Sequence, residues 1–403
     1  MKKSWFIVCL INFFIASLMG AFLRLSQLTP LPFDYTFLLH GHSHTAILGW
    51  LYLVLYGLLL HHFVPEEERE KPYYNRLFWL TQGSVFGMMV SFPIQGYALF
   101  SIFFSTAHIF CSYCFCYKIW KEQKSQSTSG RKLLKAALVF MLVSTAGVWS
   151  LGIIGATGVK NPAVYQSAIQ FFLHFQFNGW FLFAVLALLF NQPDSNDAAH
   201  IKKFRYFFNL LILATILTLG LPLNWYFPNA VLYWSNAAGV LLQFIALLLF
   251  YQLCRIPLLR YLQDKPFLIR LLAGVGLISL LLKIALQCFT IWNEIAEASH
   301  YIRNFTIGFI HLLMLGIINS AVFLFAAANP ALNFLNNKKS QLGLFLFLSG
   351  FLATEILLFL QGSYFFFGKG AIPNYTVLLF SFSLLLPLGL IVLLLKTLKK
   401  NKP

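Results

Sequence analysis

The sequence predicts an all-α, polytopic membrane protein with twelve transmembrane helices, and three observations lead to that prediction. Hydrophobic residues make up 59% of the 403 residues and charged residues only 10%, a balance that is foreign to a soluble domain of this length. The apolar residues gather in twelve segments, each about as long as a bilayer requires. The Lys and Arg residues fall almost entirely in alternate loops between those segments.

The twelve apolar segments cover most of the chain, and the loops between them are short. We place them at 5–23, 39–63, 77–98, 100–118, 133–154, 165–190, 206–223, 229–253, 268–290, 303–327, 343–361 and 375–396. The first segment follows Lys2 and Lys3 and is interpreted as a retained span rather than as a cleaved signal peptide. No loop is long enough for a soluble domain, so we expect a single transmembrane domain over residues 1–403.

The basic residues predict the orientation of the chain. With the N-terminus inside, 24 of the 29 Lys and Arg residues lie on the inner side, four lie on the outer side, and Lys283 falls within span nine. This asymmetry predicts an integral protein of the inner (cytoplasmic) membrane with both termini in the cytoplasm. The net charge of +17 is spread over short loops, so the expected partner is the lipid bilayer and not nucleic acid.

Span two opens with three histidines in five residues, His40, His42 and His44. Ionisable side chains inside a spanning helix are costly unless they are bound, which makes them candidates for function. On a helix, His40 and His44 share a face while His42 points elsewhere. At most two of the three can therefore serve one centre, and His44 lies deepest in the span.

Four even-numbered spans carry a histidine at a similar depth: His44, His108, His174 and His311 in spans two, four, six and ten. At 1.5 Å per residue, each lies roughly 8–15 Å below the outer start of its helix. Imidazoles at one depth on different helices suit a metal or heme site, because two of them can fill both axial positions of heme iron. The alternative is that each imidazole is hydrogen-bonded to a neighbouring helix.

Other polar residues could act at the same depth. Lys283 in span nine and Glu355 in span eleven could pair with each other or form a proton relay. Arg303, just before span ten, could contact a heme propionate, or it could simply be solvated. Cys111 and Cys114 fit a Cys-x-x-Cys pattern, but on an apolar helix they are interpreted as buried thiols. The sequence contains no Cys-x-x-Cys-His, so covalent c-type heme is not indicated.

Three short motifs resemble those of a known family. His44-Thr45 begins span two, and a Val-Pro-Glu-Glu sequence at 64–67 ends it. Span six has His174 four residues before Asn178, and span ten has Phe309-Ile310-His311. Together with the twelve spans, these motifs resemble subunit I of the heme-copper oxidases, especially the nitric oxide reductase and cbb3-type branch. The resemblance covers the whole chain in topology but only these motifs in sequence.

The departures from the family limit what the resemblance implies. Asn178 stands where the family has glutamate, span ten keeps only the second histidine of His-x-His, and segment 206–223 lacks the family's adjacent histidine pair. The resemblance therefore implies one low-spin heme b held by His44 and His311 more firmly than it implies a binuclear centre. His174 would be a vestigial or repurposed ligand for copper or non-heme iron, and His108, His40 or His42 could replace a lost ligand.

Several functions remain open on this basis. The implied roles are electron transfer, respiration with a cytochrome or other respiratory subunit as partner, or gas and redox sensing; oxygen or nitric oxide reduction is less expected. One alternative resembles the twelve-span heme- and copper-containing family of the nitric oxide stress response. Another is a cofactor-free transporter that uses the buried His, Lys and Glu side chains.

Overall fold

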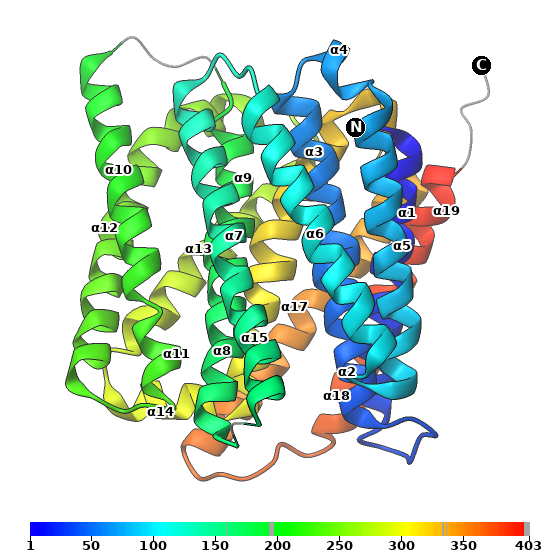
Figure 1. Ribbon diagram of the computed structural model, residues 1–403, viewed down its shortest axis with the longest axis vertical. Helices are drawn as coiled ribbons and strands as arrows, with labels where there is room; N and C mark the ends of the chain where they lie inside the picture. Colours follow the sequence, from blue (N-terminus) through cyan, green and yellow to red (C-terminus); the bar gives the residue numbers. More distant parts are fainter. Residues whose placement is uncertain (159, 193–196, 333, 336, 399–403) are drawn as a thin grey trace. The chain divides into compact units, whose positions relative to one another are not determined.

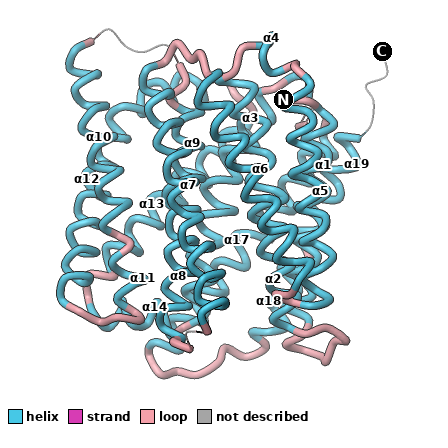
Figure 2. The backbone as a smooth tube through the Cα atoms, viewed as in Figure 1, coloured by secondary structure: helices cyan, strands magenta, loops and turns pink. Residues whose placement is uncertain are grey.

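The computed structural model describes residues 1–403 except 159, 193–196, 333, 336 and 399–403. All regular structure in the described residues is helical (Figure 2). Twelve helices in this part of the chain are long and apolar enough to cross a membrane, which confirms the predicted class and number of spans.

The chain divides into two compact units, which are described separately. Unit 1 comprises residues 1–124 and 321–403 and holds spans one to four, eleven and twelve. Its elements are α1 (Lys3–Leu25), α2 (Tyr35–His44), the π-helix η1 (Thr45–Tyr52), α3 (Leu53–Phe63), α4 (Glu66–Arg69), α5 (Pro72–Gln95), α6 (Leu99–Glu122), most of α16 (Asn319–Ala328), η4 (Pro330–Leu332), α17 (Lys338–Phe366), α18 (Tyr375–Ser383) and α19 (Leu385–Leu398) (Figure 1).

Unit 2 comprises residues 125–320 and holds spans five to nine and most of span ten. Its elements are α7 (Thr128–Thr157), α8 (Pro162–His174), the π-helix η2 (Phe175–Phe181), α9 (Leu182–Leu189), α10 (Ala198–Leu217), α11 (Gly220–Asn224), α12 (Ala230–Gln263), α13 (Phe267–Phe289), α14 (Asn293–Tyr301), α15 (Arg303–His311) and the π-helix η3 (Leu312–Ile318). The prediction of one transmembrane domain over residues 1–403 stays a prediction.

Polar residues in the loops define where several spans begin. Asp34 accepts a hydrogen bond from the Phe37 amide at 2.9 Å and caps α2. Asn161 caps α8 in the same way, and Pro162 occupies its first turn, where no amide hydrogen is needed. Asn229 caps α12 through the Leu232 amide at 3.0 Å. These caps satisfy backbone N–H groups that would otherwise have no partner at the helix ends.

The predicted apolar segments match the observed spans, but several helices run further than the apolar residues. Span eight was expected at 229–253, whereas α12 continues to Gln263. Span seven was expected at 206–223, whereas the helical span covers Ala198–Asn224. Hydropathy marks the lipid-facing stretch, while the backbone hydrogen bonds of a helix can continue through polar residues beyond it.

Burial distinguishes three spans from the other nine in the described structure. Spans two, six and ten have 72%, 83% and 67% of their most apolar window buried, against 33–56% for the others. These three spans are four apart in the chain, and each carries one of the candidate histidines. Three of the four candidate histidines, His44, His174 and His311, therefore lie on the most enclosed helices.

Gly343 and Gly389 bring α17 and α19 into close contact within unit 1. A Cβ added at Gly389 would lie 2.6 Å from the Gly343 carbonyl oxygen and 2.6 Å from the Phe347 amide nitrogen, both of them backbone atoms. Small residues of this kind let membrane helices pack closely. Neither backbone atom can move without displacing its helix.

We expect Gly389→Ala to destabilise unit 1 by about 1–3 kcal/mol, the usual cost of overpacking. The measurement is thermal unfolding of the detergent-purified protein. Gly83→Ala is the matched control, because a Cβ at Gly83 in α5 meets nothing within 4 Å and alanine favours a helix. Equal melting temperatures for the two variants would contradict the close packing of α17 and α19.

Candidate functional site

Three of the histidine-bearing spans share a local backbone structure. In each, an α-helix ends at the histidine and a π-helical segment begins at the next residue: His44 with η1, His174 with η2 and His311 with η3. π-helical turns are rare and occur frequently at functional sites, because the wider turn changes where side chains point. The three histidines therefore occupy equivalent positions on three different spans.

A glycine follows each of these histidines by five residues: Gly49, Gly179 and Gly316. A Cβ at Gly49 would lie 2.7 Å from Val85 Cγ1, and one at Gly179 would lie 2.6 Å from Phe140 Cβ. At these two positions the glycine lets a neighbouring helix approach the π-helical turn closely. This repeated His-x-x-x-x-Gly pattern could have been found in the sequence, and it was missed.

His44 is held in one tautomer by the backbone of its own helix. Its Nδ1 lies 2.9 Å from the His40 carbonyl oxygen, which can only accept, so Nδ1 carries the proton. In the neutral ring the Nε2 lone pair is then available for a ligand, with the Tyr97 hydroxyl 3.4 Å away. The imidazole stacks on the Phe92 ring at a centroid distance of 4.2 Å. Metal-bound histidines show this pattern, in which one ring nitrogen donates to a carbonyl.

His42 points away from this site, as the helical spacing predicted. Its Nδ1 lies 2.8 Å from the Ala16 carbonyl oxygen on α1, and its ring packs against Gly20. His40 and His44 share the other face, with ring centroids 6.5 Å apart. Only these two of the three histidines can serve one centre.

His108 on α6 is buried, with 2% of its surface exposed, and interacts electrostatically with His44. The Ser112 hydroxyl donates to the His108 carbonyl at 2.9 Å and lies 3.4 Å from its Nδ1. The His108 Nε2 atom is buried and has no hydrogen-bond partner among the described residues.

A row of tyrosines, Tyr52, Tyr56 and Tyr74, lies between His108 and one end of unit 1. Tyr52 lies edge-on to the His108 ring at 4.7 Å and interacts with Ser112. One turn further on, the Tyr56 hydroxyl donates to the Tyr74 carbonyl at 2.8 Å. The Tyr74 hydroxyl in turn donates to the Glu122 carboxylate at 2.7 Å. The sequence analysis missed these residues, although tyrosines four apart on an apolar span were a signal.

Glu122, which accepts from the Tyr74 hydroxyl, lies in the last turn of α6. It forms an ion pair there with Lys118, one turn before it. The Lys118 ammonium also lies over the Tyr73 ring, 4.8 Å from its centroid. Both partners sit at the same end of unit 1 as the loop that follows span two. Tyrosine hydroxyl groups therefore occur at intervals between a charged end of the unit and a buried imidazole.

His174 is engaged differently from His44. Its Nε2 lies 2.7 Å from the Thr215 carbonyl oxygen on α10, so Nε2 donates and only Nδ1 retains a lone pair. Asn178, where the resembled family has glutamate, donates to the His174 carbonyl at 3.4 Å. This is the satisfied, helix-bridging histidine that the sequence analysis kept as the alternative.

The remaining candidates fall in both units. His311 closes α15 in unit 2 and is partly buried, and Arg303 is exposed at the start of the same helix. Lys283 is fully buried in unit 2 and interacts electrostatically with His174. Glu355 belongs to unit 1, where Arg24 acts on it electrostatically. The pairs His44–His311 and Lys283–Glu355 each join the two units, and both stay predictions.

The loop before span ten forms α14, where His300 stacks on Trp225 with ring centroids 5.0 Å apart. Burial lowers the pKa of the His300 imidazole from its ordinary value. Neutral imidazole is therefore favoured here at neutral pH. The positive charge of this loop comes mainly from Arg303.

The part of the chain that the structure describes offers few clustered metal ligands. No group of three or more His, Cys, Asp or Glu side chains there could hold a metal ion. The six cysteines are free, and Cys116 is buried while Cys111 is only partly buried. Cys114 is exposed on α6, so the interpretation of all these thiols as buried was wrong at this residue. At its position on α6, the Cys114 side chain lies on the face of the helix that the rest of the chain does not cover.

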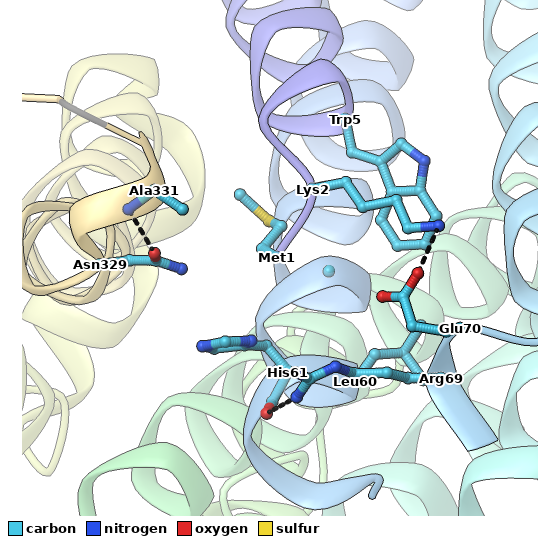
Figure 3. Close-up of a pocket in the computed structure, with 10 residues that line it drawn as sticks. Met1, Lys2, Trp5, Leu60, His61, Arg69, Glu70, Asn329 and Ala331 are labelled. Carbon is cyan, nitrogen blue, oxygen red and sulfur yellow. Dashed lines mark hydrogen bonds and ion pairs between the residues drawn. The ribbon is translucent and has the colours of Figure 1, made fainter. Parts of the chain in front are cut away.

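A pocket of about 210 Å³ opens in unit 1 at the far end of span two from His44 (Figure 3). Its lining residues are Met1, Lys2, Trp5, Gly57, Leu60, His61, Arg69, Glu70, Asn329 and Ala331. Lys2 pairs with Glu70 at 3.1 Å, and Arg69 donates to the His61 carbonyl at 3.1 Å. His61 lies roughly 25 Å along the helix from His44, so this pocket is separate from the candidate site.

Comparison with known proteins adds no family to this description. No protein-family model matches the chain, and no curated protein matches it significantly.

Proposed function

We propose that the protein is a membrane hemoprotein that binds one low-spin b-type heme through His44 and His311. The observation that carries the proposal is the state of His44, whose Nδ1 donates to the His40 carbonyl at 2.9 Å and leaves Nε2 to bind iron. Phe92 and Tyr97 supply an aromatic wall beside it. These groups fit one axial position of a heme.

The second axial ligand in this proposal is His311. It occupies the same place before a π-helical turn as His44, on another of the three most buried spans. A heme held between two imidazoles has both axial positions filled and supplies one-electron redox chemistry. The resemblance to heme-copper oxidase subunit I supports this pairing, because in that family spans two and ten bind the low-spin heme.

A second metal is not part of the proposal. His174, which would hold copper or non-heme iron in the resembled family, donates its Nε2 proton to Thr215. The proposed role is therefore electron transfer or gas and redox sensing in the inner membrane, with a cytochrome or other respiratory subunit as the partner. The distribution of Lys and Arg supports placing both termini in the cytoplasm.

A cofactor-free transporter is the second candidate, and one observation favours it. Lys283 is fully buried in unit 2, and its Nζ has no hydrogen-bond partner among the described residues. Ionisable groups of this kind mark substrate and ion pathways in membrane proteins.

The test is a dithionite-reduced minus oxidised spectrum of the purified protein, with heme and metal analysis on the same sample. We expect a sharp low-spin b-type α-band at about one heme per chain. Stoichiometric copper beside the heme would favour a member of the nitric oxide stress family. Absence of any Soret band after expression with ample heme would contradict the proposal and favour transport.

A further inference from the structure

Lys283 in unit 2 is a buried cation for which the described structure shows no partner. The residue lies on α13 with 0% of its surface exposed, and its Nζ makes no hydrogen bond to any described residue. A charged group inside a membrane span is costly and is usually paired or functional. What surrounds Lys283 therefore indicates what it binds.

The neighbouring helix α12 carries a glutamine at the same level as Lys283. After a short loop α13 runs back along α12, and Asn236 donates to the Thr290 hydroxyl at 3.2 Å. Two turns from this contact along each antiparallel helix, Gln243 and Lys283 reach the same level. Gln243 is 6% exposed, and its Oε1 is buried without a partner in the described part of the chain.

Lys283 has a second amide neighbour on its own helix. Gln287 lies one turn further along α13 on the same face, and its Oε1 is also buried without a partner among the residues described. A primary amide carries two N–H donors beside its oxygen, and rotation of the group can turn either side toward a ligand. Two amide groups therefore lie at or within one turn of the level of Lys283, and an amide that turns its N–H side toward Lys283 would offer a donor to an anion there.

Span ten and span six complete the surroundings within unit 2. A Cβ at Gly276 of α13 would lie 3.2 Å from the Ser320 Cβ, so α13 contacts span ten at the level of these two residues. Two turns further along α13, Lys283 is level with the segment of span ten that holds His311. From span six, His174 interacts electrostatically with Lys283. Both of these neighbours are imidazoles, and neither can supply a negative charge.

The described spans of unit 2 carry no carboxylate that could neutralise Lys283. Its described acidic residues are Asp197, Asp264, Glu294 and Glu297, and all four lie at helix ends or in α14, outside the spanning segments. An ammonium in this position needs a negative charge from outside the described residues of unit 2, either from a bound anion or from Glu355 as the sequence predicts, because Coulomb attraction is strong in a medium of low dielectric constant.

We propose that Lys283 is the centre of an anion site inside unit 2, which takes one singly charged anion. Gln243 and Gln287 would donate amide hydrogens to that anion beside the Lys283 ammonium. The anion is either a small inorganic ion such as chloride or a carboxylate of a bound cofactor. The carboxylate source rests on the proposed heme, whereas the inorganic source is independent of it.

The first arm of the test measures thermal unfolding of the full-length purified protein while chloride replaces a bulky anion at constant ionic strength. For a free inorganic ion, the melting temperature of the wild type rises with chloride, because a ligand that binds only the folded state stabilises it. Lys283→Met abolishes this rise and Lys283→Arg restores it. Lys160→Met, at an exposed lysine of the same unit, behaves as the wild type.

The second arm measures transfer of heme to excess apomyoglobin, with the resonance Raman propionate bands of the same samples. For a cofactor carboxylate, chloride has no effect. Lys283→Met then loses heme about tenfold faster and shifts the propionate bands, and Lys283→Arg restores both.

An effect in neither arm would overturn the anion site, and Lys283 would then be a neutral amine or the partner of Glu355 that the sequence predicts. If the purified protein contains no heme, the second arm cannot be measured, but the chloride arm still tests the anion site. Failure of the heme proposal is therefore distinguishable from failure of the anion site. If Lys283→Met does not fold, Lys283→Gln replaces it, and the chloride series on the wild type still tests the inorganic source.

Discussion

Replacing His44 by alanine is expected to lower the heme content of the purified protein by more than about tenfold. The reason is local, since the His40 carbonyl holds Nδ1 at 2.9 Å and fixes which nitrogen faces the ligand. Phe92 stacks on the same ring and restricts its rotation. Alanine removes the bond to iron and this orientation together. The measurement is heme per chain by the pyridine hemochrome method.

His40→Ala is the matched control for this variant. It removes a neighbouring imidazole on the same helix face but keeps the backbone carbonyl that orients His44. We expect it to retain heme near the wild-type level. Wild-type heme content in purified His44→Ala would show that His44 is not an axial ligand.

His311→Ala should change the spin state of any heme that remains. With His44 as the one axial ligand, the iron has an open position, so the low-spin α-band should be lost and carbon monoxide should bind. Visible spectra with and without carbon monoxide measure this change. The wild type, with both positions filled, should bind carbon monoxide weakly.

His174→Leu distinguishes a ligand from a structural histidine. His174 and His311 both precede a π-helical turn in unit 2, but the Nε2 of His174 already donates to the Thr215 carbonyl at 2.7 Å. We expect this variant to keep its low-spin heme and to lose about 1–3 kcal/mol of stability, the cost of leaving a buried carbonyl unpaired. Carbon monoxide binding in His174→Leu but not in His311→Ala would reverse the two assignments.

The sequence was sufficient to predict the fold class. Twelve apolar segments gave twelve helices, because each span must satisfy its own backbone hydrogen bonds in lipid, and length and hydropathy reveal this directly. The opposite faces of His42 and His44 also followed from the 3.6-residue period. Helix ends were less predictable: α12 runs ten residues past its expected end at 253, since polar residues can continue a helix.

The site was only partly predictable. The positions of the histidines were readable, but their partners were not, because His174 meets a carbonyl 41 residues away and His42 meets one 26 residues away. Such contacts depend on how helices pack, which spacing along one helix does not encode. The π-helical turn after each histidine was also unforeseen, although the glycine five residues later marked all three.

Contacts around His174 show why the proposal does not extend the resemblance to the oxidases to a second metal site. Asn178 replaces the family's glutamate and donates to a backbone carbonyl, which a carboxylate would repel. Together with the engaged Nε2 of His174, this is why the proposed function includes no binuclear centre.

The central claim is that one heme iron is held by two imidazoles, and near-infrared magnetic circular dichroism of the oxidised protein tests it most directly. The position of the low-spin charge-transfer band depends on the identity of both axial ligands. We predict the band of bis-imidazole coordination in the wild type and its loss in both His44→Ala and His311→Ala. A high-spin spectrum, a different ligand pair or the same band in either variant would contradict the account.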